Sequence, residues 1–178
     1  MSLAVRSRMR LDEVWWLVSP QNPLKPAAGM APFEARLARA RAVARHPRIR
    51  VLDIEARLET QLTADTVAAL RARFPHLRFA WIMGADNLLQ FHLWAAWREI
   101  ARMVPIVVVA RPPYSGRCRR APAMGWLRRF RRRHDARWRT WPLPSIVFLD
   151  LGLDSTSATA IRALDPAWAE PARPGQAA

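Results

Sequence analysis

Residues 79 to 87 read Phe-Ala-Trp-Ile-Met-Gly-Ala-Asp-Asn. The first five, Phe79 to Met83, form an apolar run of strand length, and Gly84 begins the turn that follows it. A strand without polar positions is typical of a parallel sheet that is covered on both faces. Ligands of such open sheets collect at the carboxyl ends of the strands. The residues that follow Met83 are therefore the first candidates for a binding site.

Strand and helix patterns alternate through the rest of the chain. Short apolar runs predict further strands at residues 11–19, 49–54, 105–109 and 146–151. Apolar residues at helical spacing predict helices that begin near Pro32 and Thr63, a helix over 94–103, and a short helix that ends near Leu164. This order predicts an α/β fold with one parallel sheet and helices on both of its faces.

Length and composition favour a single domain of ordinary size, since the chain has 178 residues. The longest clean apolar stretch, Met103 to Ala110, is far shorter than the roughly 20 residues that span a bilayer. The one cysteine, Cys118, excludes an internal disulfide framework and a zinc ribbon. Residues 1–10 lack the apolar core of a secretory signal, so we expect a cytoplasmic location.

The chain is strongly basic, with 29 basic and 14 acidic residues and a net charge of +15. Every basic residue except Lys25 is an arginine, which points to an anionic partner. Ten arginines lie between Arg117 and Arg139, in a stretch, 112–145, that interrupts the strand–helix order as an insertion. A nucleic-acid-binding protein is therefore an alternative interpretation, less favoured because the sequence contains no known nucleic-acid-binding motif.

Three predicted strands are followed by residues suited to phosphates and sugars. Lys25 follows the first strand, and Asp86 follows the strand at 79–83, where its carboxylate could accept hydrogen bonds from sugar hydroxyls. The last strand leads to Ser157, Thr159 and Arg162 at the start of the predicted C-terminal helix. Hydroxyl donors, helix amides and a guanidinium together favour binding of a phosphate.

Six segments, in the same order along the chain, resemble the bacterial nicotinate-nucleotide adenylyltransferases. They are Asn22–Lys25, Thr63–Thr66, Trp81–Trp94, Trp97–Ile100, Arg111-Pro112 and Ser157–Arg162. The likeness covers nearly the whole chain, from about Leu11 to Leu164. It implies a Rossmann-like nucleotidyltransferase domain over residues 1–164, followed by a flexible tail at 165–178.

The resemblance also implies the reaction: transfer of the adenylyl group of ATP to nicotinate mononucleotide, giving deamido-NAD and pyrophosphate, with Mg²⁺ as the cofactor. Nicotinamide mononucleotide or phosphopantetheine would be the nearest alternative acceptor, and no membrane partner is expected. The implied site residues are Lys25 and Arg162 at the reacting phosphates, Ser157 and Thr159 on the ATP phosphates, Gly84 and Asp86 on the ribose side, Trp94 on the nicotinate ring and Thr63 near the pyridine carboxylate.

One departure from the family pattern concerns the phosphate-binding histidines. Members carry a first strand and a loop with the pattern Gly-x-Phe-Asp-Pro-x-His-x-Gly-His, and the printed sequence does not contain it. We therefore expect the first strand to be missing, and an inactive nucleotide-binding remnant is a second interpretation. Simpler roles also stand beside the implied ones: Trp94 could be a core aromatic residue, and Asp86 and Thr63 could cap helices.

Overall fold

The computed structural model describes residues 1–20, 31–110, 115–133 and 137–151. The described residues form two compact units, one comprising 1–11 and 62–151 and the other comprising 12–61. Unit 1 contains α1 (Ser2–Met9), α4 (Thr63–Arg73), β3 (Trp81–Gly84), α5 (Ala85–Gln90), η1 (Phe91–Leu93), α6 (Trp97–Met103), β4 (Ile106–Ala110), α7 (Ser115–Cys118), α8 (Met124–Leu127), η2 (Arg128–Phe130), η3 (Trp138–Thr140) and β5 (Ile146–Asp150). Unit 2 contains β1 (Val14–Leu17), α2 (Phe33–Val43), β2 (Ile49–Leu52) and α3 (Ile54–Arg57).

The sheet of unit 1 is parallel, with the strand order β3-β4-β5. Its central strand, β4, reads Ile-Val-Val-Val-Ala and is buried at every position. Gly84 at the end of β3 is in register with Val109, which is in turn in register with Leu149 of β5. The three strands therefore end together, and the segments that follow them start from one edge.

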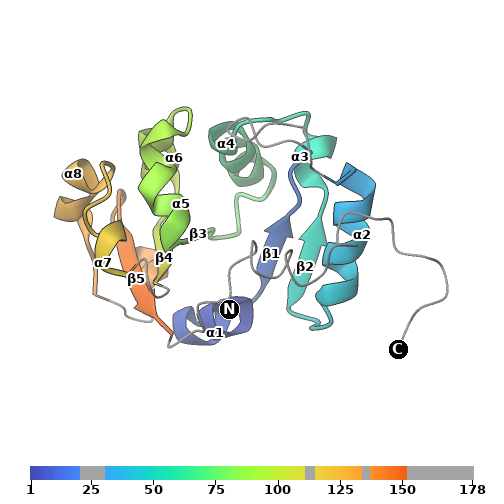
Figure 1. The fold of residues 1–178 in the computed structure, drawn as a ribbon, viewed down its shortest axis with the longest axis horizontal. Coiled ribbons are helices and arrows are strands. Elements are labelled where there is room, and N and C mark those ends of the chain that lie inside the picture. The colour runs from blue at the N-terminus through green and yellow to red at the C-terminus, as the bar shows by residue number, and fades with distance from the viewer. Residues whose placement is uncertain (21–30, 111–114, 134–136, 152–178) are drawn as a thin grey trace. The chain divides into compact units, whose positions relative to one another are not determined.

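Both faces of this sheet are covered, as the apolar strands predict. Alternate residues of a strand point to opposite faces. Ile106 and Val108 pack with the helices that follow β3 and with α4, whereas Val107 and Val109 pack with α1. Figure 1 shows α5 and α6 on one side of β3 and β4, with α1 on the other.

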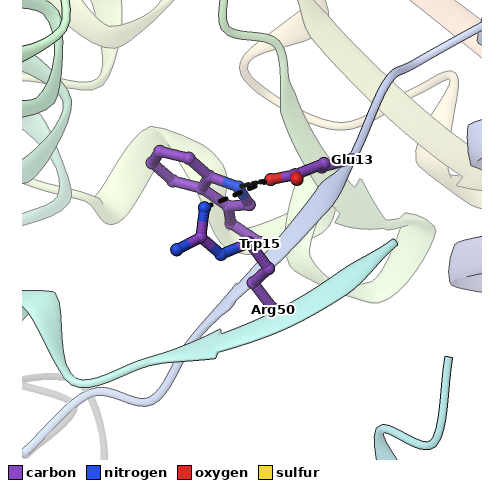
Figure 2. Close-up of polar contacts among 3 residues, drawn as sticks. All are labelled: Glu13, Trp15 and Arg50. Atoms are coloured by element: carbon purple, nitrogen blue, oxygen red, sulfur yellow. Dashed lines mark hydrogen bonds and ion pairs between the residues drawn. The ribbon is translucent and has the colours of Figure 1, made fainter. Parts of the chain in front are cut away.

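Unit 2 is built on two parallel strands, β1 and β2, with α2 packed against β2. Trp15 and Arg50 are opposite each other in the register. The Trp15 Nε1–H donates a hydrogen bond of 2.8 Å to Glu13 Oε2, and the Arg50 guanidinium lies 3.6 Å from that same oxygen (Figure 2). The Arg50 guanidinium also lies 5.7 Å from the centroid of the Trp15 ring. An ion pair and a cation–π contact thus link the two strands.

The prediction of an α/β fold with parallel strands is confirmed, but the prediction of one sheet is wrong for the described residues. These hold two separate sheets, because no described strand pairs with the second side of β1 or of β3. Each of these edge strands therefore leaves a row of backbone donors and acceptors outside any described sheet.

Several element boundaries also differ from prediction. Ile54 belongs to α3 and not to the preceding strand, which ends at Leu52. The helix expected from Trp94 begins at Trp97, because α5 and η1 take up the residues between β3 and Trp94. Sequence spacing missed α5, since it starts directly at the end of β3 without a connecting turn.

The 112–145 stretch, where described, consists of short helices and turns connecting β4 to β5. The single-domain arrangement over 1–164 stays a prediction. The helix expected to end near Leu164 and the flexible tail at 165–178 lie outside the described residues. Within the described ranges, no helix combines the length and apolar character needed to cross a bilayer.

Candidate functional site

Gly84 and Asp86 lie at the carboxyl end of β3. Gly84 is buried, ends the strand and is the N-cap residue of α5, with extended backbone angles. Asp86 is exposed in the first turn of α5, where a carboxylate interacts favourably with the helix dipole. The alternative in which Asp86 caps the helix is wrong, because Gly84 occupies that position and α5 has no side-chain cap hydrogen bond. The Asp86 carboxylate is thus presented to solvent at the edge where ligands of parallel sheets bind.

Trp94 belongs to an aromatic cluster that includes Trp81, the first residue of β3. It directly follows η1, and its indole makes edge-to-face contacts with Phe91 at 5.4 Å and with Trp81 at 6.3 Å between ring centroids. The ring is half-buried and packs against the core that includes Phe91 and Leu88. Neither neighbouring ring stacks in parallel on the indole. Trp94 therefore contributes to the core and also keeps part of its surface exposed to solvent.

Thr63 is the first residue of α4, and it is half-buried. The capping interpretation is wrong here too: the N-cap residue is Leu62, and no side-chain cap bond is made. Thr66 instead donates its hydroxyl proton to the Leu62 carbonyl oxygen at 3.2 Å. Helix α4 packs against α6, so Thr63 and Trp94 both belong to elements on the same face of the sheet.

Four of the predicted site residues lie outside the described residues: Lys25, Ser157, Thr159 and Arg162. Two features of their surroundings are nevertheless described. β5 ends at Asp150 on the same sheet edge as Gly84, and the segment that carries Ser157 and Arg162 comes later in the sequence. In unit 2, β1 ends at Leu17 and leads toward the segment that carries Lys25.

Arg36 binds the backbone on both sides of the 21–30 segment. Its guanidinium donates hydrogen bonds of 2.7 Å to the carbonyl oxygens of Ser19 and Pro20 and one of 3.0 Å to that of Ala31. Charged donors make stronger hydrogen bonds than neutral ones. One side chain of α2 therefore fixes both the point where the chain leaves β1 and the point where it enters α2.

Glu55 is a buried carboxylate near the carboxyl end of the β1–β2 sheet. Its side chain is 7% exposed, and Oε2 has no hydrogen-bond partner. Burial raises the pKa of this carboxyl, and a hydrogen bond from the Ser19 side chain opposes that effect. Ser19 follows β1 and Glu55 follows β2, so this contact connects the residues beyond two parallel strand ends.

A metal site made by protein side chains alone is not present in the described part of the chain, which contains no group of three or more histidine, cysteine or carboxylate side chains suited to one. The exposed carboxylate of Asp86 could supply a single oxygen ligand. That donor set suits an ion such as Mg²⁺, which keeps most of its waters and binds through substrate phosphates.

The comparisons with known proteins agree on one family. Residues 1–164 match the Cytidylyltransferase-like family. A protein of Erythrobacter litoralis named "Probable nicotinate-nucleotide adenylyltransferase" is 52% identical over 177 residues, which cover 98% of this chain and 80% of the relative. The chain belongs to the nicotinate-nucleotide adenylyltransferase family. Relatives with the same name from Cereibacter sphaeroides and Parvibaculum lavamentivorans are 54% and 53% identical, over 91% and 85% of this chain and 86% and 77% of the relatives.

Sequence reasoning did not single out Arg36 or Glu55. Arg36 is one of three arginines on α2, and nothing in its spacing distinguishes it from a solvated residue. Glu55 could have been noticed, because it is an acidic residue that directly follows Ile54, the last residue of the predicted strand 49–54. In this member of the adenylyltransferase family, both residues bind the backbone or side chain beyond the end of β1.

We predict that Glu55→Gln changes the pH dependence of stability. The folded pKa is raised, so the stability linked to this carboxyl is full below its ordinary value of 4.5 and is lost as pH rises through the folded pKa. Glutamine can still accept the bond from Ser19 and carries no charge to desolvate. At pH 7 the variant's melting temperature should therefore exceed that of the wild type, by about 2–4 °C for each kcal/mol of desolvation cost that is removed. Near pH 4, where the carboxyl is protonated, the two melting temperatures should match.

Melting curves between pH 4 and pH 8 provide the measurement, with Glu59→Gln as the control because Glu59 is an exposed carboxylate of the same segment. A difference between Glu55→Gln and the wild type that is the same at every pH would rule out a titrating buried carboxylate.

Proposed function

We propose that this chain joins nicotinate mononucleotide to the AMP part of ATP, giving deamido-NAD and pyrophosphate. The observation that carries the proposal is the identity of about half of all positions with relatives named for this activity, over nearly the whole chain. The exposed Asp86 just after the end of β3 suits a nucleotide, and the half-buried, partly exposed indole of Trp94 suits a planar ring. A soluble enzyme acting in the cytoplasm is part of this proposal.

The proposed reaction is a direct in-line displacement. A phosphate oxygen of the mononucleotide attacks the α-phosphorus of ATP, a new P–O–P linkage forms, and the bond to the pyrophosphate leaving group breaks. The protein supplies no covalent nucleophile in this scheme. Its task is to align two polyanions and offset their repulsion, a task that positioning and electrostatic stabilisation can fulfil.

Each predicted residue has a role suited to its chemistry. The Asp86 carboxylate would accept hydrogen bonds from ribose hydroxyls beside Gly84, whose small size allows close approach of the nucleotide. Trp94 would stack on the nicotinate ring, and Thr63 would donate to the pyridine carboxylate. The phosphates would be bound by Lys25, Ser157, Thr159 and Arg162.

We infer that Mg²⁺ would accompany ATP and would be held chiefly by the phosphate oxygens, which leaves the Asp86 carboxylate to the ribose hydroxyls. When bound, the ion offsets the negative charge of the phosphates. The described residues contribute to this chemistry by placing the mononucleotide, through Trp94 and Thr63.

A second candidate function is that of an inactive nucleotide-binding remnant. The observation behind it is that one side of β1 and one side of β3 pair with no described strand. We propose that an additional strand carrying the pattern Gly-x-Phe-Asp-Pro-x-His-x-Gly-His pairs at such an edge and brings the histidines that bind the reacting phosphates. A sheet without it would expose unpaired backbone groups and favour aggregation.

Pyrophosphate release distinguishes the two candidates. We predict that the 178-residue chain aggregates readily and shows little turnover, whereas a version with an upstream segment carrying the histidine pattern melts cooperatively and releases pyrophosphate from ATP with nicotinate mononucleotide. Nicotinamide mononucleotide, assayed in parallel, tests whether the chain prefers the acid, nicotinate mononucleotide, as the acceptor. No turnover by a stably folded extended chain would contradict the proposed reaction.

For the extended chain we predict that Trp94→Ala raises the KM for nicotinate mononucleotide about tenfold or more, with little effect on the KM for ATP. Stacking of a base on an aromatic side chain contributes about 1–3 kcal/mol, and alanine removes it. Trp94→Phe should retain part of the affinity, and the neighbouring exposed residue supplies a control in Leu93→Ala. An equal rise in both KM values would mean that Trp94 acts only in the core.

A further inference from the structure

Five arginines of unit 1 lie over half-buried aromatic rings, and the proposed reaction uses none of them. A sixth, Arg139, lies over the buried ring of Trp138. Arg98 lies 4.6 Å from the Trp97 ring and 5.9 Å from that of Trp126, measured from the guanidinium carbon to the ring centroid. Arg102 lies 5.5 Å from the Trp126 ring, and Arg129 lies 5.6 Å from the Phe130 ring. All three arginines are exposed.

The same arrangement occurs at the edge strand β5. Arg119 and Arg131 both lie over the half-buried ring of Phe148, at 5.9 and 5.6 Å. We call these five side chains and their rings the arginine–aromatic surface; its members are Arg98, Arg102, Arg119, Arg129 and Arg131 with Trp97, Trp126, Phe130 and Phe148.

The rings of this surface hold one another in place. Trp97 and Trp126 meet edge-to-face at 5.5 Å, and Trp126 meets Phe130 at 5.0 Å. Trp97, Trp126 and Phe148 also pack against the core on the helix-covered face of the sheet. The guanidinium groups above them are therefore supported by rings with fixed positions, which reduces the entropy lost when an anion binds.

Charge at this surface is almost entirely of one sign. The described residues between Trp97 and Asp150 include twelve arginines and two acidic residues, Glu99 and Asp150. Glu99 forms an ion pair with Arg102, so acidic groups neutralise little of the total. An excess of this size, concentrated in one segment, attracts a polyanion.

We propose that the arginine–aromatic surface binds single-stranded nucleic acid, with guanidinium groups on the phosphates and the exposed parts of the rings against bases. Single strands are bound by positive surfaces interleaved with aromatic side chains, which is the composition found here. A duplex fits less well: the major groove is entered by a helix or a β-ribbon, and α6 and α8 have only 7 and 4 residues.

Fluorescence anisotropy with labelled 20-nucleotide oligouridine tests the proposal on the extended chain, which is the version expected to melt cooperatively. Oligothymidine and inorganic polyphosphate serve as parallel probes. The surface variant is Arg98→Gln, Arg129→Gln and Arg131→Gln combined. The matched control is Arg71→Gln, Arg73→Gln and Arg78→Gln, which removes the same charge from exposed positions on and after α4 of the same unit. Melting curves establish that both variants fold.

We expect the surface variant to weaken oligouridine binding at least tenfold and the control variant less than threefold. For single strands the logarithm of affinity falls with the logarithm of salt concentration by about 0.7 for each phosphate contacted. Loss of three contacts should thus make the slope shallower by about 2 in the surface variant alone. Oligothymidine should bind like oligouridine, and polyphosphate more weakly, because it offers no bases.

Three results would overturn the proposal. If both variants weaken binding equally, net charge alone explains the binding. If polyphosphate binds as tightly as oligouridine, the rings make no contribution. If the chain does not bind at low salt, the arginines are only solvated side chains. Turnover plays no part in these readouts, so failure of the adenylyl-transfer proposal is measured separately.

Discussion

Burial of β4 on both faces is the constraint on which the larger unit depends. Ile106, Val107, Val108 and Val109 are each 0% exposed. Only a strand with partners on both edges and layers on both faces can reach such burial, because its backbone groups must be hydrogen-bonded and its side chains covered. β3 and β5 supply the edges, α1 supplies one layer, and the helices after β3 supply the other.

The candidate site follows from this packing. Because β3, β4 and β5 are parallel and in register, the chain leaves all three at one edge, where Gly84 and Asp86 lie. Strand β3 passes directly into α5 and η1, which brings the chain to Trp94 ten residues beyond Gly84. The buried Phe91 ring contacts both Trp94 and Trp97. One core residue therefore supports Trp94 of the candidate site and Trp97 of the arginine–aromatic surface.

The spacing of apolar residues was enough to predict a fully buried strand and a helix with one buried face. The continuous apolar run at 105–109 and the stripe of Val67 and Leu70 correspond to β4 and α4. Prediction failed where tertiary contacts determine the secondary structure of a residue. Ile54 continues an apolar run yet enters α3. Trp94 was expected to start a helix, but it lies in extended backbone because α5, which begins at Ala85, and η1 precede it. Sheet pairing cannot be deduced from a run of apolar residues, so the two separate sheets were not predicted.

Among the candidate site residues, Gly84, Asp86 and Trp94 were predicted from motif and family likeness. Glu55 and Arg36 become recognisable only through their partners, the Ser19 side chain and the neighbouring carbonyl oxygens. Hydrogen–deuterium exchange of the extended chain, with and without ATP, Mg²⁺ and nicotinate mononucleotide, tests whether substrates bind at the carboxyl edge of the sheet built around β4. Exchange is expected to slow on binding in peptides spanning 83–90 and 152–164. Protection confined to α1, on the other face of the sheet, would contradict this expectation.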